Sequence, residues 1–182
     1  MREFLFAAND SPFQVDVLPG LKEIERPEEN GSTFAENSAA KAVYYSSFTD
    51  ELVLADDSGL EVDALNGEPG IYSARYAGET ATDSDNNALL LRKMAGQPVR
   101  NAAFISVVTL AQRGNILASG TGSVQGEILM APRGENGFGY DPLFFYPPFG
   151  RSFGEIDLNE KLSVSHRGRA LQAAIAALSG QV

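Results

Sequence analysis

The order of apolar and polar positions predicts strands and helices that follow one another along the whole chain. Two long apolar segments are joined by Arg113-Gly114, which predicts a hairpin of antiparallel strands. Shorter apolar runs predict further strands, because runs of four to eight such residues suit buried strands. The predicted strands are 3–8, 14–18, 52–56, 101–112 and 115–129.

Three segments are expected to be helices, and each begins at a residue suited to a helix N-cap. Thr33 and Glu36 have the spacing of a capping box, and Thr82 and Ser165 suit the first position of the other two helices. Gly96 is a typical stop signal. The predicted helices are 33–47, 82–96 and 165–178. Together with the strands they predict an α/β fold with a mixed sheet.

The composition is that of a globular protein, with 43% hydrophobic residues. No apolar run approaches the roughly 18 residues that span a bilayer, and the N-terminus becomes polar too soon for a signal peptide. The absence of Cys excludes disulfides and thiolate metal sites. We therefore expect a cytoplasmic protein with no membrane partner. Since there is no repeat and no low-complexity linker, residues 1–182 are expected to form a single domain.

The charge balance narrows the choice of partner. Acidic residues outnumber basic ones 24 to 14, which gives a net charge of −10. This argues against a nucleic-acid partner, because a nucleic-acid surface needs clustered Lys and Arg. A small phosphorylated ligand stays compatible, since a divalent cation can bridge carboxylates to phosphates.

Adjacent carboxylates, Asp56 and Asp57, follow the strand predicted over 52–56. Mg²⁺ prefers oxygen ligands and needs only one or two carboxylates beside substrate phosphates, so these acids are candidate ligands. Other candidates are Glu28, Glu29 and Glu36. The structural alternative is an ordinary turn at Asp57-Ser58-Gly59, with Glu36 serving only the capping box. Spacing alone favours that alternative.

Two further segments carry candidate chemistry. In the Gly-rich loop 134–145, Phe138 could stack on a base and Asp141 could accept a hydrogen bond from it. The alternative is that Phe138 and Tyr140 fill the core. Near the C-terminus, basic residues gather at the start of a predicted helix, where they oppose the helix dipole and favour an anion site. These residues are Lys161, His166, Arg167 and Arg169.

Long stretches of the chain resemble the inosine triphosphate pyrophosphatase family. The matching stretches are STFAENSAAKA (32–42), LADDSGLEVDALNGEPGIYSARYAG (54–78), TDSDNN (82–87), GFGYDPLF (137–144) and EKLSVSHRGRAL (160–171). The resemblance implies an elongated α/β fold with two lobes around a central groove, and a homodimer. It also implies Mg²⁺-dependent cleavage of ITP, dITP or XTP, a purine nucleoside triphosphate substrate, to the monophosphate and pyrophosphate.

The same resemblance assigns roles to residues that match the family's motifs. It implies that Asp57 is the general base and a metal ligand, with Glu28, Glu36 and Asp56 completing the acidic metal site. It implies substrate contacts from Ser58, Phe138, Gly139, Tyr140, Asp141, Lys161, His166 and Arg167. Phe138 would stack on the base.

The N-terminus departs from the family's pattern. The family has a loop of the form T-[GNS]-N-x-x-K and then a long helix, whereas FLFAAND (4–10) is followed by Ser11-Pro12. Ala8, Asn9 and Asp10 would still contact substrate, but the loop Lys and the first helix are expected to be missing. We expect another subunit or a rearranged N-terminus to cover the sheet face left bare. The alternative function is a non-catalytic nucleotide-binding protein impaired in positioning the triphosphate.

Overall fold

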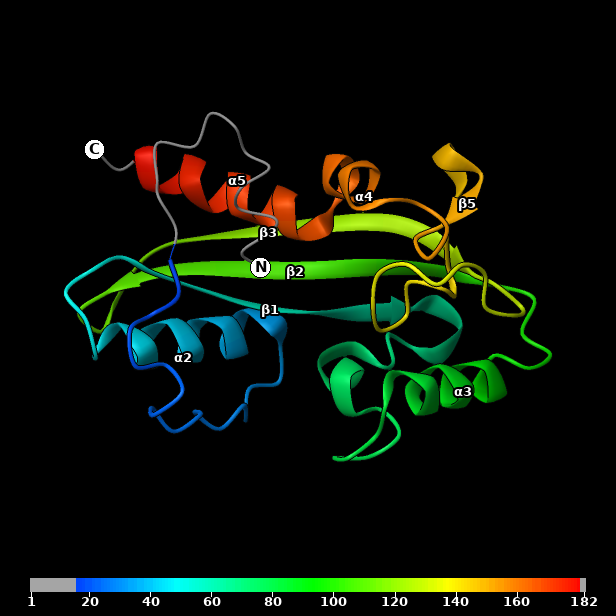
Figure 1. Cartoon of the computed structure of the whole chain (residues 1–182), viewed down its shortest axis with the longest axis horizontal. Coiled ribbons are helices and arrows are strands. Elements are labelled where there is room, and N and C mark those ends of the chain that lie inside the picture. Colours follow the sequence, from blue (N-terminus) through cyan, green and yellow to red (C-terminus); the bar gives the residue numbers. More distant parts are fainter. Residues whose placement is uncertain (1–15, 181–182) are drawn as a thin grey trace. The chain divides into compact units, whose positions relative to one another are not determined.

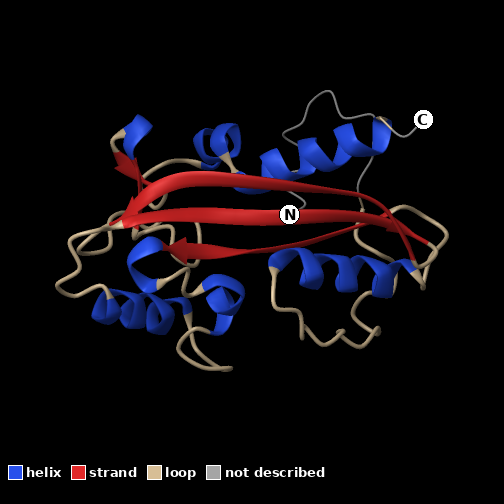
Figure 2. Ribbon diagram, turned by 180° about the vertical axis from the view of Figure 1, so that it is seen from behind, coloured by secondary structure: helices blue, strands red, loops and turns tan. Residues whose placement is uncertain are grey.

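A computed structural model describes residues 16–180. Figure 1 shows strands and helices in the order of the sequence, and Figure 2 shows the same elements from behind. The α-helices are α2 (Phe34–Ser46), α3 (Asp83–Lys93), α4 (Leu158–Val164) and α5 (His166–Ser179). The strands are β1 (Val53–Val62), β2 (Asn101–Gln112), β3 (Asn115–Ile128), β4 (Phe144–Tyr146) and β5 (Arg151–Ser152). Short 3₁₀ helices are η1 (Asp63–Leu65), η2 (Gly70–Arg75) and η3 (Pro147–Phe149).

One sheet contains the five described strands in the order β1-β2-β3-β4-β5. The tight turn between β2 and β3 has positive φ at Arg113 and Gly114, 50° and 77°, as a hairpin of this kind requires. β4 pairs antiparallel with β3, Ile128 opposite Phe144, and also antiparallel with β5. The expected α/β fold is therefore confirmed.

The chain forms two compact units, which we call unit 1 and unit 2. Of the described residues, unit 1 comprises 16–57, 106–122 and 165–180, and unit 2 comprises 58–105 and 123–164. The sequence interpretation, a single domain with two lobes, stays a prediction.

In unit 1, helices cover both faces of the strands they contact (Figure 1). From α2, the Ser38 hydroxyl donates to Ala55 O and contacts Thr109 Oγ1 at 2.9 Å. From α5, Ala170 and Ala174 pack into an apolar cluster with Val108, which lies next to Thr109 and faces the other way. Unit 1 therefore has three layers, with α2 and α5 on opposite faces of its strands.

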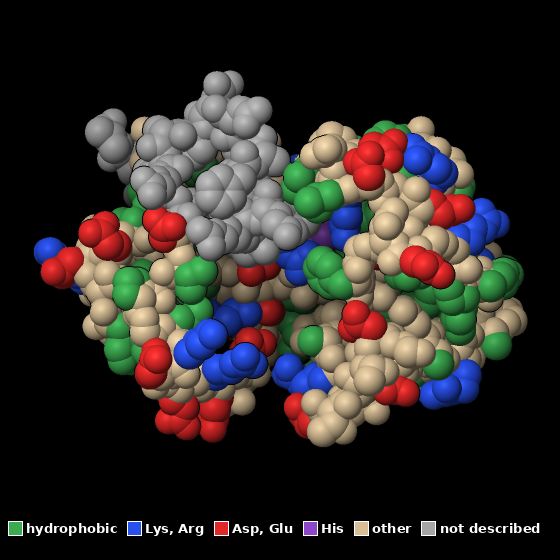
Figure 3. All heavy atoms as spheres, viewed as in Figure 1, with side chains coloured by type: hydrophobic (Ala, Val, Ile, Leu, Met, Phe, Trp, Pro, Cys, Tyr) green, Lys and Arg blue, Asp and Glu red, His purple; other side chains and the backbone are tan. Residues whose placement is uncertain are grey.

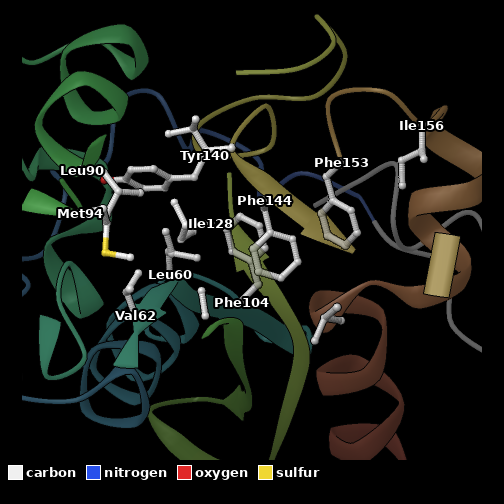
Figure 4. Close-up of a cluster of buried hydrophobic side chains, with 13 residues drawn as sticks. Leu60, Val62, Leu90, Met94, Phe104, Ile128, Tyr140, Phe144, Phe153 and Ile156 are labelled. Atoms are coloured by element: carbon white, nitrogen blue, oxygen red, sulfur yellow. The ribbon is translucent and has the colours of Figure 1, made fainter. Parts of the chain in front are cut away.

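Unit 2 has a separate aromatic core. Figure 4 shows this cluster, in which the ring centroids of Phe104 and Phe144 are 4.5 Å apart and those of Phe144 and Phe153 are 4.9 Å apart. Leu90 of α3 and Tyr140 of the Gly-rich loop belong to the same cluster. The core thus ties the loop to α3.

Two predicted strands need correction. Residues 16–18, which were predicted to end a strand over 14–18, form no regular structure, and the chain turns at Pro19-Gly20. The strand predicted over 52–56 does not stop at the two acids, because β1 continues to Val62. The predicted strand 3–8 lies outside the described residues. β4, β5 and α4 were not predicted, since two to seven residues give too little periodicity.

Helix boundaries agree with the predicted caps. Thr33 Oγ1 accepts from Glu36 N, Thr82 forms a full capping box with Asp85, and Ser165 accepts from Gly168 N. α3 ends at Lys93, before the predicted stop at Gly96. Within residues 16–180, no helix is long and apolar enough to cross a bilayer.

Candidate functional site

Asp57 lies at the centre of a polar group in unit 1. Lys41 Nζ donates to its Oδ1 at 2.8 Å, and Asn37 Nδ2 donates to its Oδ2 at 3.2 Å. Both partners come from α2 and are four residues apart, so they lie on one face of the helix. Only 12% of the Asp57 side chain is exposed. Helix α2 therefore holds this carboxylate in a fixed orientation.

The acidic loop before α2 is attached to the same group. Glu29 Oε1 lies 3.4 Å from Lys41 Nζ, so one ammonium contacts two carboxylates. Asn37 Oδ1 also accepts from Gly31 N at 2.8 Å, which fixes the end of the loop against α2. A side chain at Gly31 would meet Asn37 Oδ1 at 2.6 Å, so the close approach requires glycine.

The pKa of the Asp57 carboxyl group is higher than usual. Burial raises the pKa of Asp57 above its usual 3.8, and the hydrogen bonds and charge of Lys41 oppose this shift without reversing it. A carboxylate with a raised pKa accepts a proton more readily at neutral pH. Burial thus makes Asp57 a stronger base than an exposed aspartate.

Asp56 faces the other side of β1. Its Oδ2 lies 3.3 Å from Nε of Arg167, the second residue of α5. Successive side chains of a strand point to opposite faces, so Asp56 faces α5 while Asp57 faces α2. Each acid has its own cation, and the strand can continue through both.

The other predicted acidic ligands, Glu28 and Glu36, accept hydrogen bonds from nearby residues of the loop before α2. Glu28 Oε2 accepts from Asn30 Nδ2 at 2.7 Å. Glu36 Oε2 accepts from the backbone N and the hydroxyl of Ser32, at 2.6 and 2.8 Å, and these bonds lower the Glu36 pKa below 4.5. The structure does not bring together the four acids predicted to bind a metal. Among residues 16–180, no three His, Cys, Asp or Glu side chains form a group that could hold an ion.

The first turn of α5 carries two of the predicted basic residues. His166 is buried, with 2% of its surface exposed, so it is not a surface histidine. The helix begins this close to β3 because Gly122 has no side chain, and a Cβ there would lie 2.2 Å from His166 O and 2.4 Å from Ala170 N. Gly122 therefore sets the position of His166 and Arg167.

In unit 2 the Gly-rich loop forms a compact polar turn. Asp141 Oδ2 accepts from Phe138 N at 2.9 Å. A Cβ at Gly137 would lie 2.1 Å from that oxygen, and Gly137 has φ +78°, so both contact and conformation require glycine. Phe138 is 55% exposed, whereas Tyr140 is 4% exposed and its hydroxyl donates to Ser73 O at 2.9 Å. Of the two aromatics, only Tyr140 fills the core.

Lys161 joins this turn from α4. Its ammonium forms a buried ion pair with Asp141, and 6% and 3% of the two side chains are exposed. The same nitrogen lies 4.8 Å from the centroid of the Phe138 ring. The four residues Phe138 to Asp141 and Lys161 therefore form one group in unit 2. Among the basic residues, Lys161 belongs to unit 2, and His166 and Arg167 belong to unit 1.

The remaining predicted substrate contacts are Ser58 and three residues near the N-terminus. Ser58 follows Asp57 in β1 and is partly buried in unit 2. Ala8, Asn9 and Asp10 lie outside the described residues, as does the N-terminal departure from the family pattern. On the face of the molecule shown in Figure 3, acidic and basic side chains of the described residues are interspersed.

Sequence reasoning missed Asn37 and Lys41 as site residues. Their spacing of four in the predicted helix 33–47 places them on one face, which was a usable signal. The sequence did not indicate that this face meets Asp57, which is 16 residues from Lys41.

A comparison with protein families matches residues 1–177 to the Ham1 family. The chain belongs to the Ham1 family. A dITP/XTP pyrophosphatase from Desulforamulus reducens is 49% identical over 167 residues, which cover 91% of this chain and 82% of the relative. A second dITP/XTP pyrophosphatase, from Acidobacterium capsulatum, is 46% identical and is matched over 99% of this chain and 93% of its own.

Solved structures of the Ham1 family have the same fold. The Staphylococcus aureus Ham1 protein has a TM-score of 0.87 and 39% identity, over 99% of this chain and 93% of that chain. A Coxiella burnetii HAM1 protein has a TM-score of 0.86 and 38% identity, with 98% and 92% covered. The resemblance drawn from the motifs is therefore confirmed.

Proposed function

We propose that the protein is an Mg²⁺-dependent pyrophosphatase that hydrolyses ITP, dITP and XTP to the nucleoside monophosphate and pyrophosphate. The single observation that carries this proposal is the Asp57 carboxylate, held by Lys41 and Asn37 with a pKa raised by burial. A general base needs a carboxylate that is held in place and accepts a proton readily. The proposal is supported by the relatives named dITP/XTP pyrophosphatase at 46–49% identity.

In the proposed reaction, water attacks the α-phosphorus of the nucleotide. Asp57 accepts the proton as the new oxygen–phosphorus bond forms. The bond between the α-phosphorus and the bridging oxygen breaks, and pyrophosphate leaves with its electron pair. Lys41 and Asn37 keep the accepting oxygens in place, which favours one direction of attack.

The residues present are chemically suited to Mg²⁺. Asp57 and Glu29 place carboxylate oxygens around one positive charge, Lys41 Nζ, and one or two carboxylates suffice when substrate phosphates supply further ligands. Asp57 and Glu29 would hold the ion, with Glu28 and Glu36 nearby in sequence. When bound, Mg²⁺ neutralises phosphate charge and polarises the scissile bond. Asp56 faces α5, so we propose that it supports the site by orienting Arg167.

We propose that the base is recognised by the group in unit 2 that consists of residues 138–141 and Lys161. The exposed Phe138 ring offers a face on which a purine can stack, and stacking of this kind contributes roughly 1–3 kcal/mol. Backbone groups of Gly139 and Tyr140 and the Asp141–Lys161 pair would read the edge of the base. In unit 1, Arg167 and His166 lie at the N-terminus of α5, where an anion is favoured.

The test is pyrophosphate release from ITP, XTP, dITP and ATP with and without Mg²⁺, for the wild type and Asp57→Asn. We expect turnover of ITP and XTP well above that of ATP, and a loss of at least 100-fold in Asp57→Asn, since positioned proton transfer contributes 10²–10⁴-fold. Lack of turnover together with measurable binding of ITP would favour the nucleotide-binding alternative. Equal activity of Asp57→Asn would exclude Asp57 as the base.

A further inference from the structure

Gly139, in the middle of the Gly-rich loop, is held through both of its backbone polar groups. The Asp83 carboxylate accepts from Gly139 N at 2.7 Å. The Asn87 side-chain amide donates to Gly139 O at 2.9 Å. Because a carbonyl oxygen can only accept, the orientation of the Asn87 amide is fixed by this bond. Two side chains therefore hold the two peptide groups that flank the Gly139 Cα, one on each side.

Both clamping residues come from the start of α3. Asp83 is the first residue of the helix and Asn87 is four residues later, so they share one face. Gly139 is 56 residues away from Asp83 in the sequence, and all three residues lie in unit 2. These two polar bonds to one distant residue add to the core contacts between the loop and α3.

The clamp fixes the part of the loop between Phe138 and Tyr140. Gly139 has φ +59°, a left-handed conformation that an unrestrained glycine leaves easily. On one side of Gly139, the exposed Phe138 has its backbone N tied to Asp141. On the other side, Tyr140 is anchored in the core beside Leu90, as Figure 4 shows. Between these anchors, side chains of α3 bond to both the N and the O of Gly139.

We propose that Asp83 and Asn87 are positioning residues that set the base specificity of the enzyme by fixing the backbone on both sides of Gly139. This inference rests on the proposed function, in which the loop from Phe138 to Asp141 receives the purine. A fixed loop backbone presents one set of contacts to the edge of the base, and under the proposed function that set favours 6-oxopurines such as hypoxanthine over adenine. A loop backbone that is free to move can adapt to either kind of base and therefore discriminates less between them.

Asp85 provides a matched control on the same helix. It is also an aspartate in the first turn of α3, but its carboxylate accepts from the backbone and hydroxyl of Thr82 and not from the loop. Asp83→Ala and Asp85→Ala each remove one negative charge from the helix N-terminus. A difference between them therefore reports the contact with Gly139. Asn87→Ala removes the second half of the clamp.

The experiment measures kcat and KM for ITP and ATP in the wild type and the three variants, well below their melting temperatures. For Asp83→Ala and Asn87→Ala we expect the ratio of kcat/KM for ITP to that for ATP to fall about 3- to 10-fold, the size of one hydrogen bond. The main change is expected in KM, and Asp85→Ala should keep the wild-type ratio. An unchanged ratio in both clamp variants, or an equal fall in Asp85→Ala, would overturn the proposal.

Hydrogen exchange of the Gly139 amide separates this inference from the proposed function. Asp83→Ala should speed this exchange in the free protein by about 3- to 10-fold, whereas Asp85→Ala should not. If the wild-type protein does not turn over ITP, the proposed function is wrong. Faster exchange of the Gly139 amide in Asp83→Ala would still establish the clamp in that case. Unchanged exchange in Asp83→Ala would disprove the clamp even in an active enzyme.

Discussion

Asp56 and Asp57 can be neighbours because the pleat of β1 turns them to opposite faces. Asp57 contacts Lys41 and Asn37 of α2, and Asp56 contacts Arg167 of α5. Since like charges on opposite faces are each paired with a cation, their mutual repulsion is small beside the attraction to these partners. The pair is thus two separate interactions, one with α2 and one with α5.

The ion pair of Lys161 with Asp141 gives a prediction at the residue scale. Both side chains are almost fully buried, so Lys161→Met leaves an uncompensated carboxylate beside apolar groups. We expect this variant to lower the free energy of unfolding by about 3–5 kcal/mol, measured by urea denaturation at pH 7.

A double variant distinguishes the loss of the pair from a loss of packing. Lys161→Met with Asp141→Asn removes both charges and keeps an oxygen that can accept from Phe138 N. It should be more stable than Lys161→Met alone. If the double variant is the less stable of the two, stranded charge is not the cause of the destabilisation.

The contact of α5 with β3 gives a prediction at the scale of elements. Gly122→Ala would place a Cβ within 2.4 Å of two backbone atoms of α5, and backbone cannot move away as a flexible side chain can. We expect a loss of about 2–3 kcal/mol in the free energy of unfolding, from urea titration. Because the displaced turn carries His166 and Arg167, turnover of ITP should also fall in the folded variant.

Thr121 is the matched control for Gly122. It is the preceding residue of β3, and its side chain is exposed on the other face of the strand. Thr121→Ala should cost less than about 1 kcal/mol and leave turnover unchanged. If the two substitutions have equal effects, Gly122 is not needed for the close approach of α5 to β3.

Assembly gives a prediction at the scale of the whole molecule. The family resemblance implies a homodimer, and the sequence also suggests that a second subunit could cover a bare sheet face. We expect sedimentation equilibrium to give twice the 19.5 kDa mass of the chain at micromolar concentration. A mass of one chain across the whole concentration range would exclude the subunit explanation. The N-terminal residues on which that explanation depends lie outside residues 16–180.

The elements with strong local signals were predictable from the sequence. Thr33, Thr82 and Ser165 cap the helices as predicted, and Arg113-Gly114 forms the hairpin turn. These features depend on neighbours within about four residues, so the sequence contains their full cause. The end of the first long strand was predicted wrongly, because the cations that allow β1 to continue come from other elements.

The motifs by themselves determined the family, the α/β fold and the residues worth examining. Only the tertiary structure decided which of these residues meet. Lys41 reaches Asp57 across 16 residues, Asp83 reaches Gly139 across 56, and Arg167 reaches Asp56 across 111. A motif lists residues in order along the chain, but the direction of each side chain depends on the strand face or helix face that packing selects. For that reason the acids predicted as one metal site are divided among the two faces of β1, the loop before α2 and the first turn of α2. The residues that hold the central groups are Asn37, Lys41, Asp83 and Asn87, to which the sequence assigned no role.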